Sequence, residues 1–148
     1  MAGAAFEPRV SLITLGARDI PRLAAFYEAL GWQRTPNPHD VVAFDLIGQT
    51  LALYELDDLA RDLGLPPEAL GHGAMTLAHN VRNREDVAAL IARAAAAGGK
   101  VLRPAGEIFW GGVIGYFADP EGHIWEIAWN PHAPLSDAGA FRWNGYGK

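Results

Sequence analysis

The sequence predicts an α+β fold in which one βαβββ unit occurs twice. In each half of the chain a strand-like run precedes an amphipathic helix, the helix ends at glycine, and short strand-like runs follow. The halves also align around their turns, since Ala17-Arg18-Asp19 corresponds to Val81-Arg82-Asn83, and Gly48 precedes a closing strand as Gly122 does. A repeat this long exceeds a solenoid unit, so we expect two modules within a single domain.

The first half opens with a β-branched and apolar run at residues 10–17, which predicts a strand. Asp19 is expected to cap the following helix, whose apolar positions recur at helical spacing as far as Leu30. Gly31 is expected to end this helix. Three short strands are then predicted, at residues 33–35, 41–47 and 50–54.

The second half repeats this order, with a strand predicted at residues 74–81 and Asn83 as the helix cap. Val87, Leu90 and Ile91 mark the apolar face of the helix, and Gly98 follows its end. Asp119-Pro120-Glu121-Gly122 has the residue order of a type I turn. The predicted strands of this half lie at residues 100–103, 113–118 and 123–129.

These elements divide the single domain, residues 1–148, into four segments. The modules span about 8–55 and 73–130, and a connector at 56–72 contains a short amphipathic helix that stops at Gly64. The tail at 131–148 interleaves turn residues with Phe141, Trp143 and Tyr146. Aromatic side chains are costly to leave in water, so we expect the tail to dock on the body or on a partner.

Composition excludes several classes of function. The chain is 50% hydrophobic and 20% charged, which suits one globular unit with a core. Its net charge of −5 argues against nucleic acid as a partner. It has no cysteine, so disulfides, thiolate nucleophiles and Cys-ligated zinc are excluded. No apolar run reaches the length of a membrane span, and we expect a cytoplasmic protein without a membrane partner.

Glu126 is the most informative single residue, because it interrupts the apolar run Ile124-Trp125-Glu126-Ile127-Ala128-Trp129. A carboxylate in a buried strand is costly unless it has a partner. Two interpretations remain open: Glu126 is a structural residue paired with an arginine or a backbone N–H, or it is a site residue that acts as a base or anchors a cationic ligand.

Strand alternation predicts which residues share a face with Glu126. The expected lining is mostly apolar, with a few hydroxyls and one amide, and such a surface suits a small organic molecule. Phe109 and Trp110, followed by two glycines, are expected at its rim, and Tyr54 is expected to be able to donate to Glu126 or to a substrate. The expected lining residues are Leu12, Thr14, Ala52, Tyr54, Thr76 and Asn80.

Two motifs carry a family resemblance. Phe26-Tyr27-Glu28-Ala29-Leu30-Gly31 occurs in the first half, and Asp119-Pro120-Glu121-Gly122-His123 occurs in the second. In this order, around a duplicated pattern, they resemble the vicinal oxygen chelate superfamily, which includes glyoxalase I, extradiol dioxygenases, and bleomycin and fosfomycin resistance proteins. The resemblance implies two βαβββ modules forming a curled mixed sheet around a central cleft.

The resemblance also implies where a metal would bind, because each module of the family's metal enzymes supplies one ligand from its first strand and one from its last. The matching positions here are Leu12, Ala52, Thr76 and Glu126, of which only Glu126 has a ligand side chain. One carboxylate does not hold a divalent ion, so we expect neither a metal nor a cofactor. His79 is out of phase with these positions and should point to the helix side.

The leading hypothesis is a metal-free protein that binds a small organic molecule in the cleft between its modules, and we expect a homodimer, as is common in the family it resembles. If it performs proton chemistry, Glu126 and Tyr54 are the expected catalytic residues. One alternative is a metal-dependent glyoxalase-like lyase or dioxygenase. Another is a protein–protein interaction module with a vestigial cleft.

Overall fold

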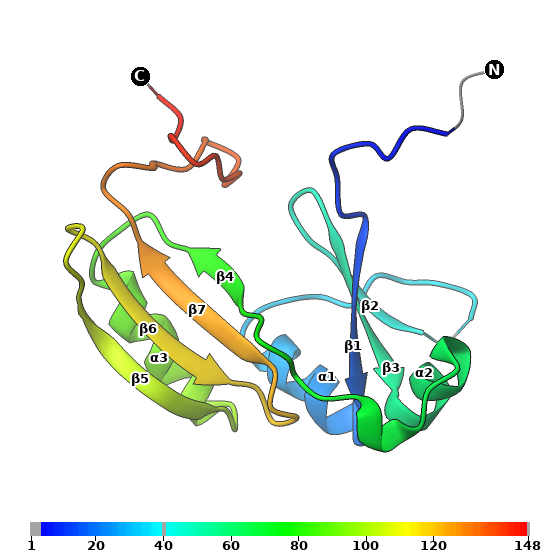
Figure 1. Cartoon of the computed structure of the whole chain (residues 1–148). Coiled ribbons are helices and arrows are strands. Elements are labelled where there is room, and N and C mark those ends of the chain that lie inside the picture. The colour runs from blue at the N-terminus through cyan, green and yellow to red at the C-terminus, as the bar shows by residue number, and fades with distance from the viewer. Residues whose placement is uncertain (1–3, 40, 148) are drawn as a thin grey trace.

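The computed structural model describes residues 4–39 and 41–147 and contains two separate mixed sheets (Figure 1). Sheet A has the order β1 (Leu12–Ala17), β3 (Thr50–Glu55), β2 (Val42–Asp45). Sheet B has the order β4 (Leu77–Asn80), β7 (Ile124–Trp129), β6 (Val113–Ala118), β5 (Lys100–Glu107). In each sheet the first strand pairs in parallel with the last strand of its module, and the other pairings are antiparallel. The predicted α+β class is confirmed.

The first helix, α1 (Ile20–Ala29), has the predicted boundaries. The Asp19 side chain accepts a hydrogen bond from the backbone N–H of Arg22 at 3.1 Å, which is the expected cap. Gly31 follows the helix with a φ of 109°, a left-handed conformation that favours glycine. The cap and the stop define the two ends of α1, and the buried side of the helix packs against β3 of sheet A.

The strand predicted at residues 33–35 does not form, so sheet A has one strand fewer than sheet B. Only Thr35 joins the sheet: its backbone N–H donates to the carbonyl of Ala43 at 2.7 Å, and its hydroxyl accepts from Asp45 N at 2.8 Å. Pro36 and Pro38 follow, and a proline has no N–H to extend a ladder. The prolines therefore prevent the pairing from continuing beyond Thr35, and the segment keeps one backbone hydrogen bond to β2.

The second module departs from its predicted boundaries at three elements, of which one is β5, predicted at 100–103 and observed at Lys100–Glu107. The helix α3 (Asp86–Ala96) begins after Glu85, so the prediction of Asn83 as its cap was wrong. Asn83 instead forms a turn before the helix, in which its carbonyl accepts from Asp86 N at 3.1 Å. The strand β4 begins at Leu77, which leaves Thr76 outside the ladder. The connector contains the expected helix, α2 (Leu56–Leu63), followed by a 3₁₀ turn, η1 (Pro67–Ala69).

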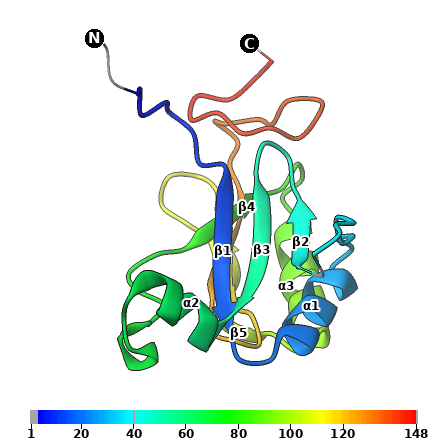
Figure 2. The ribbon, with the colours of Figure 1, turned by 90° about the vertical axis from the view of Figure 1, so that its right-hand side faces the viewer.

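One hydrophobic core is shared by the two modules. The helices α1 and α3 lie on the same side of the molecule (Figure 2), and the Arg93 guanidinium on α3 donates to the Ala29 carbonyl of α1 at 3.3 Å. The rings of Phe26 on α1 and Phe117 on β6 pack with centroids 5.9 Å apart. The residues of both sheets that face α1 and α3 therefore point into this core, and the alternate residues of each strand point away from it. We call the sheet surfaces that point away from the core the outer faces.

The tail lies against the body of the protein. The Arg82 guanidinium donates to the carbonyls of Ser136 and Asp137 at 2.9 and 3.0 Å, and Ala133 is buried. Trp143 remains 85% exposed. Of the helices in the described part of the chain, none combines the length and the apolar character that crossing a membrane requires.

Candidate functional site

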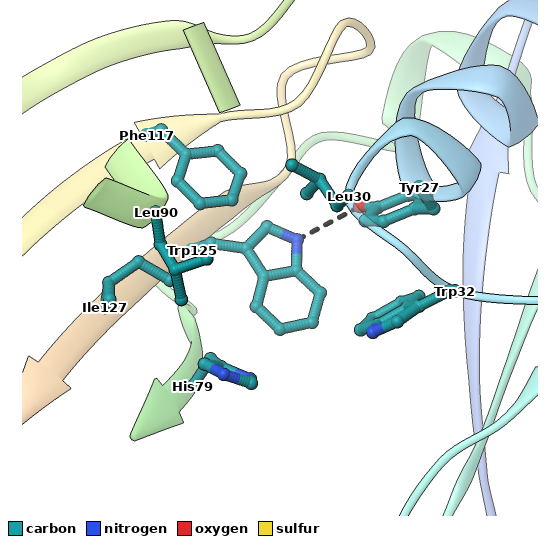
Figure 3. Close-up of a pocket in the computed structure, with 8 residues that line it drawn as sticks. All are labelled: Tyr27, Leu30, Trp32, His79, Leu90, Phe117, Trp125 and Ile127. Carbon is teal, nitrogen blue, oxygen red and sulfur yellow. Dashed lines mark hydrogen bonds between the residues drawn. The ribbon is translucent and has the colours of Figure 1, made fainter. Parts of the chain in front are cut away.

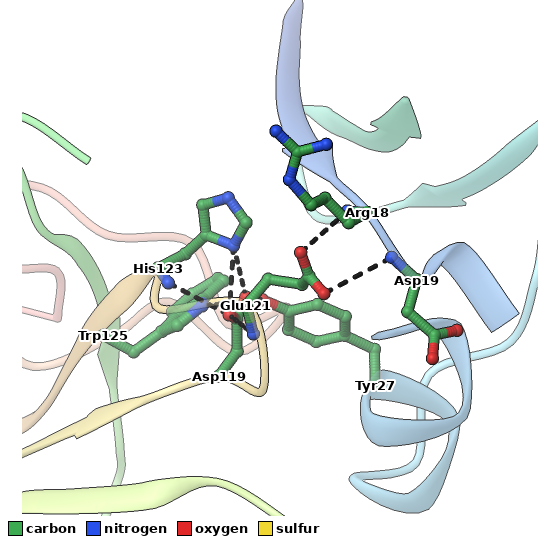
Figure 4. A network of polar contacts seen from close by, with 7 residues as sticks. All are labelled: Arg18, Asp19, Tyr27, Asp119, Glu121, His123 and Trp125. Atoms are coloured by element: carbon green, nitrogen blue, oxygen red, sulfur yellow. Dashed lines mark hydrogen bonds and ion pairs between the residues drawn. The ribbon is translucent and has the colours of Figure 1, made fainter. Parts of the chain in front are cut away.

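The turn between β6 and β7 holds a buried polar network (Figure 4). Asp119 accepts from the Tyr27 hydroxyl at 2.6 Å and contacts His123 Nδ1 at 2.8 Å, while the indole N–H of Trp125 donates to the Tyr27 oxygen at 3.0 Å. Burial alone raises the pKa of Asp119, but the hydrogen bonds from His123 and Tyr27 outweigh it and lower the pKa below its usual value. Asp119 is therefore an ionised residue whose partners are all internal.

The same network joins the modules. Burial, and then the charge of Asp119, raise the pKa of Tyr27, so its hydroxyl remains a hydrogen-bond donor. Glu121 from the turn accepts from the backbone N–H groups of Arg18 and Asp19, at 2.8 and 3.4 Å, beside the N-terminus of α1. Each of these polar groups is used in holding α1 to the β6–β7 turn. The two motifs that carry the family resemblance therefore form a structural joint.

A small pocket lies between the modules on the helix side of sheet B (Figure 3). Its volume is about 60 Å³, far below the roughly 300–1,000 Å³ of typical sites for organic ligands. His79 faces this pocket, as its phase in the strand predicts, and burial lowers its pKa, which favours the neutral imidazole. The walls are otherwise mainly aromatic and aliphatic, formed by Tyr27, Leu30, Trp32, Leu90, Phe117, Trp125 and Ile127.

Glu126 lies on the other side of the same strand, on the outer face of sheet B. Trp125 and Ile127 point into the core, so alternation directs Glu126 away from it. The Tyr116 hydroxyl on β6 donates to Glu126 Oε2 at 2.5 Å, and both side chains are half-buried. This hydrogen bond raises the pKa of Tyr116, with burial adding to the effect, so the phenol stays protonated. The partner that a carboxylate in an apolar strand requires is thus a tyrosine.

Small and aliphatic residues surround this pair. The pairing register places Ala78 on β4 and Tyr116 on β6 on either side of Glu126. One strand position away along the same face, Asn80 aligns with Ala128 and Ile114. The surface is an apolar floor with a carboxylate and a phenol at its centre. Its remaining members are Ala118 and Ile124.

Trp110 lies at one end of this face. A Cβ built on Gly112 would come within 1.9 Å of the Trp110 ring, so the indole covers Gly112 immediately before β6. Alternation puts Gly112 on the same side as Ile114 and Tyr116. Phe109 is 96% exposed beyond it. The structure therefore brings Trp110 near the face of Glu126 and leaves Phe109 in solvent.

The residues predicted to line the other half of the site lie on the outer face of sheet A. Leu12 is 52% exposed, Thr14 is exposed, and Ala52 is nearly buried. The Tyr54 hydroxyl donates to Asp62 on α2 at 2.7 Å, so its hydrogen bond goes to the connector helix and not to Glu126. The structure thus places the predicted lining on two outer faces, each directed away from the shared core.

Sequence analysis missed Tyr116, although a signal for it was present. The predicted turn at Asp119–Gly122 joins two antiparallel strands, and counting back across it pairs Ala118 with Ile124 and hence Tyr116 with Glu126. The residues at the family's ligand positions do not fit a divalent ion, because Leu12 and Ala52 have no donor atom and Thr76 is a weak neutral ligand. Within the described residues no three His, Cys, Asp or Glu side chains are grouped to hold a metal.

Comparisons with known proteins agree with this architecture. Residues 9–127 match the family model described as Glyoxalase/Bleomycin resistance protein/Dioxygenase superfamily. Among solved structures, the chain is similar to a glyoxalase-related enzyme from Fulvimarina pelagi, with 40% identity, a TM-score of 0.85, and coverage of 94% of this chain and 100% of that one. No curated protein matches.

Two further structures, from Burkholderia phytofirmans PsJN and Agrobacterium tumefaciens, share the fold at lower identity. The first is a glyoxalase/bleomycin resistance protein/dioxygenase family enzyme, with 22% identity, a TM-score of 0.70, and coverage of 80% of this chain and 96% of that one. The second is a lactoylglutathione lyase, with 21% identity, a TM-score of 0.63, and coverage of 84% and 95%.

Proposed function

We propose that this chain, which belongs to the glyoxalase/bleomycin resistance protein/dioxygenase superfamily, binds a small organic molecule on the outer face of sheet B without a metal ion. The observation that carries the proposal is the Glu126–Tyr116 pair, on a surface whose other β4, β6 and β7 residues are small or aliphatic apart from Asn80. A few polar groups on an apolar floor are the usual make-up of a small-molecule site.

Glu126 is the proposed anchor. Its Oε2 accepts a hydrogen bond from the Tyr116 hydroxyl, and a carboxylate oxygen has further lone pairs for a donor or cation on the ligand. Because the pair is half-buried, a charge-assisted hydrogen bond to it is less screened than one in open water. Tyr54 is occupied by Asp62, so we assign the hydroxyl of the site to Tyr116.

We propose a homodimer in which a second copy supplies the opposite wall. The support is geometric: the outer faces of the two sheets both point away from the core, and Leu12 and Thr14 are exposed on sheet A. In a two-fold dimer, sheet A of one copy can cover sheet B of the other, and symmetry then creates two equivalent sites. Light scattering at micromolar concentration tests this assembly, and a clean monomer mass would contradict it.

The first test of function is a binding titration. A ligand from a thermal-shift screen is titrated into the wild type, Glu126→Gln and the control Glu68→Gln, which changes an exposed carboxylate in the connector. We expect Glu126→Gln to weaken a cationic ligand by about 1–3 kcal/mol and the control to leave its affinity unchanged. Equal affinities for all three proteins would place the ligand elsewhere.

A second test separates this proposal from a metal-dependent lyase or dioxygenase. Elemental analysis of protein prepared without chelator should find no stoichiometric divalent metal, because Leu12, Ala52 and Thr76 cannot complete a ligand set around Glu126. About one tightly held Mn, Fe, Ni or Zn per chain would overturn the metal-free proposal.

A further inference from the structure

Arg103 on β5 continues the row of polar residues across sheet B. The pairing register aligns Arg103 with Tyr116, and Tyr116 with Glu126. We call these three residues the polar row. Adjacent strands lie about 4.8 Å apart, so the backbone of Arg103 lies about 10 Å from that of Glu126, with Tyr116 between them. The charge of Arg103 also lowers the pKa of Tyr116, against the larger effect of Glu126, as expected of a neighbour.

The guanidinium of Arg103 forms no hydrogen bond or ion pair with any of the described residues. Most arginines of the chain donate to a carboxylate, a carbonyl or a hydroxyl, as Arg34 does to Glu28 and Arg84 does to Glu107. Arg22 and Arg103 are the two whose side chains have no hydrogen bond or ion pair in that part of the chain. Both arginines are exposed, but Arg22 lies on α1, whereas Arg103 is paired across the sheet with the half-buried Tyr116.

The strand around Arg103 is irregular on both sides. The pairing of β5 with β6 shifts between Val101 and Arg103, and again between Arg103 and Gly106. Pro104 follows directly, and it cannot donate to the ladder. Bulges of this kind re-aim side chains and are over-represented beside functional sites. Arg103 is nonetheless in register with Tyr116, so the irregular strand retains the alignment of the polar row.

We propose that Arg103 binds an anionic oxygen group, a carboxylate or a phosphate, of the molecule that occupies the outer face of sheet B. This inference rests on the proposed function and adds the charge class of the ligand. A guanidinium offers paired donors that match the two oxygens of such a group. Glu126 repels an anion at the other end of the row, so the row orients the ligand with its acid toward β5 and its donor or cation toward β7.

The test uses the full chain and three probes of similar shape: benzoate and phenyl phosphate, which are anionic, and benzamide, which is neutral. Arginine Nε–Hε signals are followed by NMR during each titration, with the Arg103 and Arg22 signals assigned from Arg103→Met and Arg22→Met. We expect the Arg103 signal to shift saturably with at least one anion and not with benzamide. Arg103→Met should weaken that anion by roughly tenfold or more, and Arg22→Met should not change its affinity.

The remaining outcomes separate this inference from the proposed function. Arg103→Lys keeps the charge but loses the paired donors, so it should recover only part of the affinity. If Glu126→Gln changes the binding of a screened ligand while Arg103→Met changes neither that ligand nor the anions, the site stands and the role of Arg103 is wrong. Equal, unsaturable shifts of Arg103 and Arg22 with the anions would show non-specific contact and overturn the inference.

Discussion

The outer faces of the two sheets share the arrangement of three strands but have different side chains at matching positions. In sheet A, the row through the last strand of the module reads Thr14, Ala52 and Ala43. In sheet B, the matching row reads Ala78, Glu126 and Tyr116. The inner faces, by contrast, both contribute large apolar residues to one core.

This difference shows that the topology and the residue types determine different properties of a face. The topology determines which positions are neighbours on a face, and it does so in the same way for the three strands that the modules have in common, β1-β3-β2 and β4-β7-β6. The residue types at those positions then determine whether the face has polar groups to offer a ligand. The inner faces should therefore govern stability, and the outer face of sheet B should govern binding.

The largest effect is expected on the inner side, at the joint between the modules. Asp119→Ala leaves the buried Tyr27 hydroxyl and the His123 ring without their acceptor, so we expect a loss of about 2–4 kcal/mol in the free energy of unfolding. Urea denaturation measures it. The control Asp137→Ala, at an exposed tail position, should change stability by less than about 0.5 kcal/mol. Equal midpoints would contradict a structural joint.

A second prediction transfers the polar pair to sheet A. Ala52→Glu puts a carboxylate on a nearly buried position that has an alanine, and no phenol, opposite it on β2, so we expect a loss of about 1–3 kcal/mol. The double variant Ala52→Glu/Ala43→Tyr restores the cross-strand pair and should recover about 1 kcal/mol in a double-mutant cycle. Strictly additive effects would mean that the tyrosine does not compensate for the carboxylate.

A third prediction concerns the end of the outer face of sheet B. Gly112→Ala places a methyl group against the Trp110 ring and the Trp129 carbonyl oxygen, so we expect about 1–2 kcal/mol of destabilisation and altered tryptophan fluorescence. Gly106→Ala, on the neighbouring strand with open space around its Cβ position, serves as the matched control. Identical spectra and stabilities for the two variants would show that Trp110 does not cover Gly112.

The smallest effect is a pH dependence from His79. Its pKa in the folded protein lies below its ordinary value, so the folded state binds fewer protons than the unfolded state. Stability should therefore decrease as the pH falls below about 6.5. His79→Asn should flatten this slope, while His39→Asn, in an exposed loop, should retain it.

Asp119 affects the stability at lower pH. Its pKa is lowered in the folded protein, so its contribution to the free energy of unfolding persists above about pH 4 and is lost as the pH falls through the folded pKa.

The sequence predicted the local features best. Asp19 and Gly31 identify the ends of α1 because caps and stops depend on neighbouring residues alone. Pro36 and Pro38 were a local signal against the strand at residues 33–35, and a count across the β6–β7 turn pairs Tyr116 with Glu126. Both the missing strand and the Tyr116–Glu126 pair could therefore have been inferred from residue type and spacing in the sequence.

Other features depend on how distant segments pack. The hydrogen bond from Tyr54 to Asp62 requires the position of α2 on sheet A, which strand alternation does not supply. Alternation also assigns residues to the two faces of each sheet without saying how the two sheets face each other. The prediction that Leu12 and Glu126 line one cleft rests on alternation alone. In the structure, the outer faces of both sheets point away from the shared core.

The most direct test of the account locates a bound ligand by the indole N–H signals of the tryptophans. Trp110 lies at the end of the outer face of sheet B, while Trp32 lines the pocket between the modules. Addition of a ligand from the thermal-shift screen should shift the Trp110 signal saturably and leave the Trp32 signal in place, and Glu126→Gln should weaken that response. A saturable shift of Trp32 with an unchanged Trp110 signal would move the site to the pocket between the modules and contradict the account.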